Sequence, residues 1–120
     1  MSTTQELARQ AALRYIDCIN HKQLEPLLQL FAADGQLNHP FGLFQGRDKL
    51  AEFYGGLVMQ ADTTLVLHRI AAENDICVVE VSATSPQAPD KIQYALDLFQ
   101  VDAQGKITDL SIYYRNVNLG

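Results

Sequence analysis

The order of hydrophobic periodicities along the chain limits its fold more than any other feature. The first half repeats apolar residues at helical spacing, whereas the stretch after Gln60 is rich in Val, Ile, Leu, Thr and aromatic residues. Helical segments followed by a run of strands are typical of α+β proteins, in which helices cover one face of an antiparallel sheet. We therefore expect an α+β fold, with residues 1–120 forming a single domain.

The first half predicts three helices separated by short connections. A capping box from Thr3 to Glu6 begins the first helix, which ends near His21 and Lys22. The second starts near Glu25, and the third covers Arg47 to Leu57. Their buried sides are, in order, Leu7, Ala11, Tyr15 and Ile19, then Leu27, Leu28, Leu30 and Phe31, then Leu50, Phe53, Tyr54 and Leu57. A short extended piece, Gln36–His39, and a loop, Gly42–Gly46, lie between the last two helices.

The second half predicts four strands joined by turns. The turn signals are Asn74-Asp75, the proline-containing stretch from Ser85 to Asp90, and Asp102 to Gly105. Short connections favour an antiparallel meander. The predicted strands are Thr63–Ala72, Ile76–Thr84, Ile92–Val101 and Ile107–Val117.

Charge and motif content exclude several classes of function. The formal net charge of -5 argues against nucleic acid or an anionic membrane surface as the main partner, and no apolar run is long enough to span a membrane. The polar segment before Gln10 has no signal-peptide core, so we expect a cytoplasmic location. The histidines His21, His39 and His68 form no metal motif, and no phosphate-binding loop is present; we expect no metal and no cofactor.

Three polar residues fall where apolar residues are expected. Tyr15 lies on the apolar face of the first helix, Asp97 lies in the strand "YALDLF", and His39 precedes a proline in "LNHPFG". An aspartate with apolar neighbours on both faces of a strand should be protonated or hydrogen-bonded, and desolvation should raise its pKa. Each residue also has a structural interpretation: a core tyrosine, an aspartate pointing outward at a sheet edge, and a surface histidine.

The order of these residues resembles that of a known family. "RYIDCINHKQLEPLLQLFAADGQLNHPFG" is similar to the opening segment of the ketosteroid isomerases, members of the nuclear transport factor 2-like (SnoaL-like) superfamily. "GRDKLAEFY" and "ALDLFQV" continue the resemblance, which covers nearly the whole chain in element order. It implies a cone-shaped, strongly curved, mostly antiparallel sheet with three N-terminal helices packed in its concavity.

The resemblance also implies roles for the three polar residues. Tyr15 and Asp97 match the two donors that hold the substrate oxyanion, with Asp97 as a neutral carboxylic acid. His39 stands where the family has an aspartate as general base. A neutral histidine can accept a proton there, although an ion pair between His39 and Asp97 would instead ionise Asp97. We expect Phe31, Phe53, Tyr54 and Phe99 to line the pocket or the core.

Three functions remain open at this stage. The first is an isomerase-like enzyme that shifts a proton alpha to a carbonyl in an apolar small molecule, steroid-like or polyketide-like. The second is a SnoaL-type polyketide cyclase or dehydratase that uses His39 and Asp97. The third is a non-enzymatic, ligand-binding dimeric module. We expect a homodimer through the open sheet face, with Ile112, Tyr114 and Val117 as candidate contacts.

Overall fold

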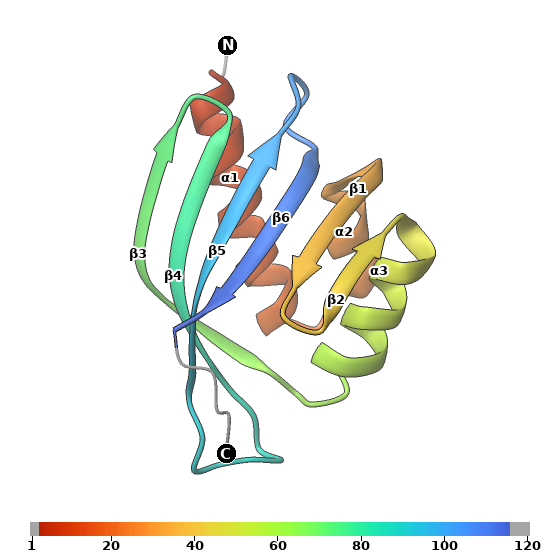
Figure 1. The fold of residues 1–120 in the computed structure, drawn as a ribbon, viewed down its shortest axis with the longest axis vertical. Helices are drawn as coiled ribbons and strands as arrows, with labels where there is room; N and C mark the ends of the chain where they lie inside the picture. Colours follow the sequence, from red (N-terminus) through yellow and green to blue (C-terminus); the bar gives the residue numbers. More distant parts are fainter. Residues whose placement is uncertain (1–2, 116–120) are drawn as a thin grey trace.

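The computed structural model describes residues 3–115 and has the predicted α+β architecture (Figure 1). Within this range, two helices, two strands and a third helix come first, and four further strands follow without an intervening helix. The helices are α1 (Thr4–Asn20), α2 (Leu24–Gln29) and α3 (Arg47–Phe53), which continues as a π-helical turn, η1 (Tyr54–Val58). The strands are β1 (Phe31–His39), β2 (Gly42–Gln45), β3 (Thr64–Glu73), β4 (Ile76–Thr84), β5 (Gln93–Val101) and β6 (Ile107–Tyr114).

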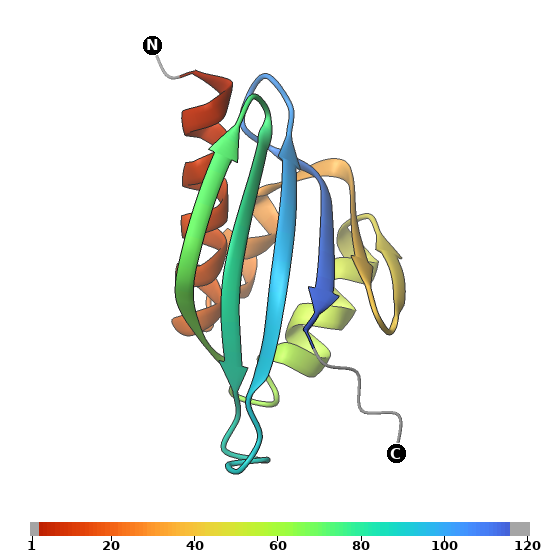
Figure 2. The same cartoon turned by 60° about the vertical axis from the view of Figure 1, so that its left-hand side comes forward.

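The strands form one curved, open sheet in the order β2-β1-β6-β5-β4-β3. The predicted meander is confirmed, because β3, β4, β5 and β6 pair antiparallel in sequence order. The pairing of β1 with β6 is parallel and joins the two halves of the chain. Figure 2 shows the curved strands side by side, with α1 behind β3; a cone outline stays a prediction.

Helix α1 packs across the concave face of the sheet because its apolar residues recur every three to four positions. Its N-cap is Thr3, whose side chain accepts a hydrogen bond from the Glu6 N–H, as predicted. At its other end, Asn20 both donates to and accepts from the backbone of Leu65 in β3. The residues buried against β3, β4 and β5 are Ala8, Ala11, Ala12, Tyr15, Ile16, Cys18 and Ile19.

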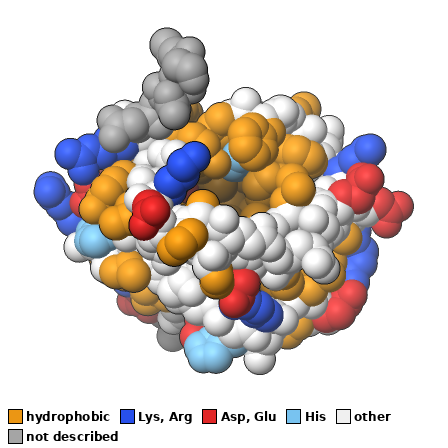
Figure 3. Space-filling view, turned by 90° about the horizontal axis from the view of Figure 1, so that it is seen from below, with side chains coloured by type: hydrophobic (Ala, Val, Ile, Leu, Met, Phe, Trp, Pro, Cys, Tyr) orange, Lys and Arg blue, Asp and Glu red, His pale blue; other side chains and the backbone are white. Residues whose placement is uncertain are grey.

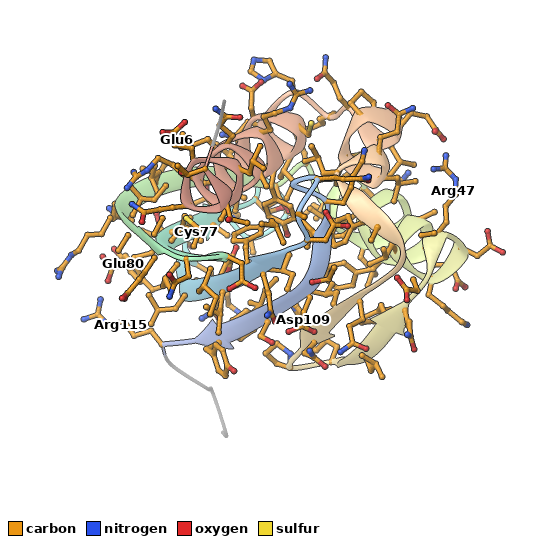
Figure 4. The ribbon with its side chains drawn as sticks, turned by 90° about the horizontal axis from the view of Figure 1, so that it is seen from above. Glu6, Arg47, Cys77, Glu80, Asp109 and Arg115 are labelled. Carbon is orange, nitrogen blue, oxygen red and sulfur yellow. The ribbon has the colours of Figure 1, made fainter. Side chains whose placement is uncertain are left out.

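Strand alternation separates a covered face from an open one. In Figure 4, Cys77 lies between α1 and the sheet, whereas Glu80 and Asp109 lie on the opposite face. The open face also carries apolar side chains: Leu96 and Tyr113, which are direct neighbours on β5 and β6, are 45% and 58% exposed. Ile112 and Tyr114, which were predicted to contribute contacts on the open face, lie on the covered face instead. Val117 lies outside the described residues.

The segment between α2 and α3 differs most from the prediction. Phe31 is not part of the second helix but the first residue of β1, which is longer than the predicted piece from Gln36. The predicted loop from Gly42 is strand β2, because only Pro40 and Phe41 separate it from β1 and the two form a hairpin. Pairing with β6 thus extends β1 beyond the four residues, Gln36–His39, that the sequence predicted to be extended.

The third helix changes its winding at Tyr54. The predicted helix from Arg47 to Leu57 is α-helical to Phe53 and π-helical to Val58. Gly55 and Gly56 lie in the wider turn; a Cβ at Gly55 would come within 3.0 Å of a Leu24 methyl group, whereas Gly56 has room for one.

Candidate active site

A cavity of about 330 Å³ lies between the concave face of the sheet and the helices. In Figure 3 it is a hollow ringed by hydrophobic side chains. Residues far apart in the sequence build its wall. They are Tyr15 and Ile19 from α1; His39 and Phe41 from the β1–β2 hairpin; Phe53, Leu57 and Val58 from α3 and η1; Ala61, Thr63 and Leu65; and, from the central strands, Val81, Ala83, Gln93, Ala95, Asp97, Ile112 and Tyr114.

Tyr15 presents its hydroxyl from the buried face of α1. The hydroxyl lies 2.8 Å from that of Tyr54, which is fully buried at the start of η1. The ring of Tyr15 packs edge-on against Phe99, with ring centroids 5.1 Å apart. Burial, reinforced by the neighbouring Tyr54, raises the pKa of Tyr15 well above its usual value. Tyr15 is therefore a neutral hydrogen-bond donor at any working pH.

Asp97 enters the cavity from the middle of β5. It faces the same side as its cross-strand neighbours Val79 and Ile112, both apolar, and is only 3% exposed. Its Oδ1 atom is buried and has no hydrogen-bond partner in the described part of the chain. Burial raises the pKa of Asp97 from 3.8 to about 7. Near neutral pH, both the protonated and the ionised form of this carboxyl group are therefore populated.

His39 ends β1 and has a hydrogen bond at each ring nitrogen. The backbone N–H of Phe41 donates to Nδ1 at 3.1 Å, and Nε2 lies 2.9 Å from the hydroxyl oxygen of Tyr114. The rings of Phe41 and Phe53 pack on the imidazole, each with a centroid separation of 4.7 Å. Burial lowers the pKa of His39 from 6.5 to about 4, so the ring is neutral at pH 7.

His39 and Asp97 line the same cavity without forming an ion pair. The charge of Asp97 instead acts on the tyrosines: it raises the pKa of Tyr15, Tyr54 and Tyr114. The carboxylate form of Asp97 is therefore not stabilised by a histidine. Of the two arrangements open at the sequence level, the structure has the one with separate His39 and Asp97 side chains.

The predicted aromatic residues divide between cavity and core. Phe53 lines the cavity and packs on His39. Phe31, Tyr54 and Phe99 are buried core residues outside the cavity wall, and Tyr54 and Phe99 position the ring of Tyr15. Tyr54 also packs edge-on against Phe53, and Phe31 packs against Tyr54.

Tyr114 is a polar cavity residue that the sequence did not lead us to expect there. It was assigned to a subunit interface, but it pairs with Ala95 in β5 and shares the inward face of Asp97. The signal was present in the alternation of β6, because Leu110 and Ile112 precede Tyr114 at even spacing and are all in phase with buried residues of β5.

The described residues offer neither a metal site nor a membrane-spanning helix. Among them, no three His, Cys, Asp or Glu side chains gather in a way that could hold a metal ion. Within the same residues, no helix has the length and apolar character needed to cross a membrane. The cavity is thus the feature of the described chain in which ionisable groups and an apolar wall converge.

Comparison with known proteins points to one family. Residues 12–110 match the model of the SnoaL-like domain. A Steroid Delta-isomerase from Nocardioides simplex is 27% identical over 107 residues, which cover 87% of this chain and 86% of the relative. A provisionally assigned ketosteroid isomerase from Kribbella flavida has the same fold, with a TM-score of 0.84 at 21% identity, over 98% of this chain and 84% of its own. The epoxide hydrolase/cyclase-like enzyme SalBIII, described in pyran ring formation in the polyether salinomycin, has a TM-score of 0.79 at 17% identity, over 89% of each chain.

Proposed function

We propose that this chain, which belongs to the SnoaL-like domain family, is an enzyme that moves a proton next to a carbonyl group in a small apolar molecule. The observation that carries the proposal is Asp97, a buried carboxyl group with an unpartnered oxygen in an apolar cavity beside Tyr15. Such a group costs free energy in the folded protein, and the cost is understandable if a ligand supplies the missing interaction. The similarity to a Steroid Delta-isomerase supports the same class of reaction.

In this reaction Tyr15 binds the carbonyl oxygen. Tyr54 is fully buried, so its hydroxyl can donate to Tyr15 and leave the proton of Tyr15 for the ligand. When the carbon–hydrogen bond breaks, its electron pair moves toward the carbonyl oxygen, and the hydrogen bond from Tyr15 strengthens. A preorganised donor of this kind contributes roughly 10²–10³ in rate.

Asp97 carries the proton in the arrangement that the hydrogen bonds favour. Its carboxylate takes the proton from carbon, becomes a neutral acid, and returns the proton to another carbon of the enolate. A pKa of about 7 suits this role, since an acid–base group works best near the ambient pH. His39 is less suited in the ligand-free arrangement, because its Nδ1 lone pair already accepts the N–H of Phe41.

A second arrangement follows the family resemblance, with His39 as base and both Tyr15 and Asp97 as donors. It is supported by the neutral state of His39 and by its place in the cavity wall. It requires Nδ1 to separate from the N–H of Phe41, since a protonated imidazole has no lone pair to offer that donor.

The pH dependence of α-proton exchange distinguishes the two arrangements. The measurement is incorporation of deuterium next to the carbonyl of 2-tetralone, a small apolar ketone, in D2O from pH 5 to 9. With Asp97 as base, the rate rises through about pH 7; with Asp97 as donor, it falls through the same value. Asp97→Asn and Tyr15→Phe should each lower the rate at least 100-fold. Exchange that both substitutions leave unchanged would refute the proposed function.

A cyclase or dehydratase is a second candidate function. The observation that favours it is the presence of a proton acceptor and several hydroxyl donors around one cavity, because ring closure and dehydration each require one proton taken and one given. The fold likeness to SalBIII is compatible with it.

If the cavity binds apolar ligands but no proton exchange is observed, the non-enzymatic module becomes the better interpretation.

A further inference from the structure

The hydrogen bonds of His39 determine which of its nitrogens carries the proton. A backbone N–H can only donate, so the bond from Phe41 requires a lone pair on Nδ1. A neutral imidazole has one N–H, which must then be at Nε2. Nε2 therefore donates to the hydroxyl oxygen of Tyr114, 2.9 Å away.

This direction leaves the hydroxyl proton of Tyr114 available. The oxygen of Tyr114 accepts from His39, so its own O–H must point to a different acceptor. Among the described residues, that hydroxyl makes no other hydrogen bond. Tyr114 lines the cavity, and its ring meets the imidazole at 90°, which holds the hydroxyl at the wall.

Tyr114 and Asp97 approach the cavity from diagonal positions on neighbouring strands. Asp97 faces Ile112 across the pair, and Tyr114 faces Ala95. Diagonal positions of this kind are roughly 7 Å apart, so the two polar groups can meet different atoms of one ligand.

We propose that Tyr114 is a second ligand-binding hydrogen-bond donor, held in its donating orientation by His39. The ligand then carries a second oxygen acceptor, such as an ether, ester or further carbonyl group, apart from the oxygen bound by Tyr15. The inference rests on the proposed function only in that the same cavity binds the substrate. It resembles the pair of Tyr15 and Tyr54, in which Tyr54 can donate to Tyr15.

The first test is the tautomer of His39, measured by long-range ¹⁵N–¹H NMR correlations at pH 7. We expect the Nε2–H form. The Nδ1–H form would overturn the proposal, because Tyr114 would then donate to Nε2 and have no proton for a ligand. This measurement requires neither substrate nor turnover.

The second test is fluorescence titration with two-ring phenols. The probes are 6-methoxy- and 7-methoxy-2-naphthol, each compared with the ethyl analogue of the same shape, which lacks the second oxygen. The wild-type chain should bind at least one methoxy probe more tightly than its ethyl analogue, and Tyr114→Phe should reduce that preference roughly 2- to 10-fold. Tyr113→Phe is the matched control, because the neighbouring Tyr113 lies on the open face of the sheet.

A preference that survives in Tyr114→Phe, or no binding of any probe to the wild-type chain, would overturn the inference. Neither result decides the proposed function, which is judged separately by deuterium exchange in Asp97→Asn and Tyr15→Phe. Loss of exchange in those two variants together with an unchanged methoxy preference would retain the enzyme and remove Tyr114 from its binding site.

Discussion

The hydroxyl oxygens of Tyr15 and Tyr54 lie 2.8 Å apart, and the two residues differ in access: Tyr15 lines the cavity, whereas Tyr54 is fully buried. This difference predicts unequal effects of removing either hydroxyl. Tyr15→Phe leaves the Tyr54 hydroxyl buried without its partner and should destabilise the fold by about 1–3 kcal/mol. Tyr54→Phe leaves the Tyr15 hydroxyl at the cavity, where water can reach it, and should cost about 1 kcal/mol or less. Urea denaturation of both variants measures their free energies of unfolding. Equal losses of stability in Tyr15→Phe and Tyr54→Phe would contradict the prediction.

The carboxyl group of Asp97 makes stability depend on pH. Because its pKa is raised from 3.8 to about 7, the folded chain holds a proton between these values that the unfolded chain has released. Its contribution to stability therefore falls as pH rises from about 4 to about 7, by on the order of 4 kcal/mol in total. Asp97→Asn removes this loss, so its stability relative to the wild type should increase over that range. Denaturation at pH 4.5 and 7.5 measures it, with Asp90→Asn, an exposed aspartate, as control.

His39 produces the opposite slope. Its pKa is lowered from 6.5 to about 4, so between these values the unfolded chain binds a proton that the folded chain does not. Its contribution to stability therefore rises with pH from about 4 to 6.5. His39→Gln should lose stability relative to the wild type as pH increases over this range, and urea denaturation of both proteins at pH 4.5 and 6.5 measures the difference. A pH-independent difference for His39→Gln would show that its folded and unfolded pKa values are alike.

Two glycines predict opposite effects of alanine. A Cβ at Gly35 would lie 2.7 Å from the carbonyl oxygen of Ile107, so Gly35→Ala must move the β1–β6 pairing and should cost about 1–3 kcal/mol. A Cβ at Gly56 in η1 would have no atom within 4 Å, and Gly56→Ala should stabilise the chain by up to about 1 kcal/mol. Thermal denaturation of Gly35→Ala and Gly56→Ala measures both effects. Melting temperatures equal to that of the wild type in both variants would contradict the close β1–β6 contact at Gly35.

We propose that the open face of the sheet mediates a homodimer. Leu96 and Tyr113 leave an apolar surface there that a second chain could cover. Light scattering should give the mass of a dimer for the wild type and of a monomer for Leu96→Lys. Leu13→Lys is the matched control, since Leu13 is similarly exposed, at 42%, but lies on α1. A monomeric wild-type chain would end this proposal.

Local sequence was sufficient for most of the fold and for the inward position of two candidate site residues. Tyr15 repeats with Ala11 and Ile19 at helical spacing, and Asp97 alternates in phase with Ala95 and Phe99. Periodicity fixes which face of an element is apolar, so the inward position of both side chains could be predicted without knowing their neighbours. The raised pKa of Asp97 followed from the same pattern, since it depends on burial alone.

Only the tertiary structure decided how the polar groups are paired. The partners in the His39–Tyr114 bond are 75 residues apart, and those in the Tyr15–Tyr54 bond 39 apart. His39 and Tyr114 meet because β1 pairs parallel with β6, a contact that neither segment specifies by its own periodicity. The same pairing extended β1 back to Phe31. Sequence thus determined which residues face inward, because facing is a local property of helix and strand geometry. The proton positions on His39 and Tyr114 depend on donors and acceptors that only the folded chain brings within 3 Å or so of each other.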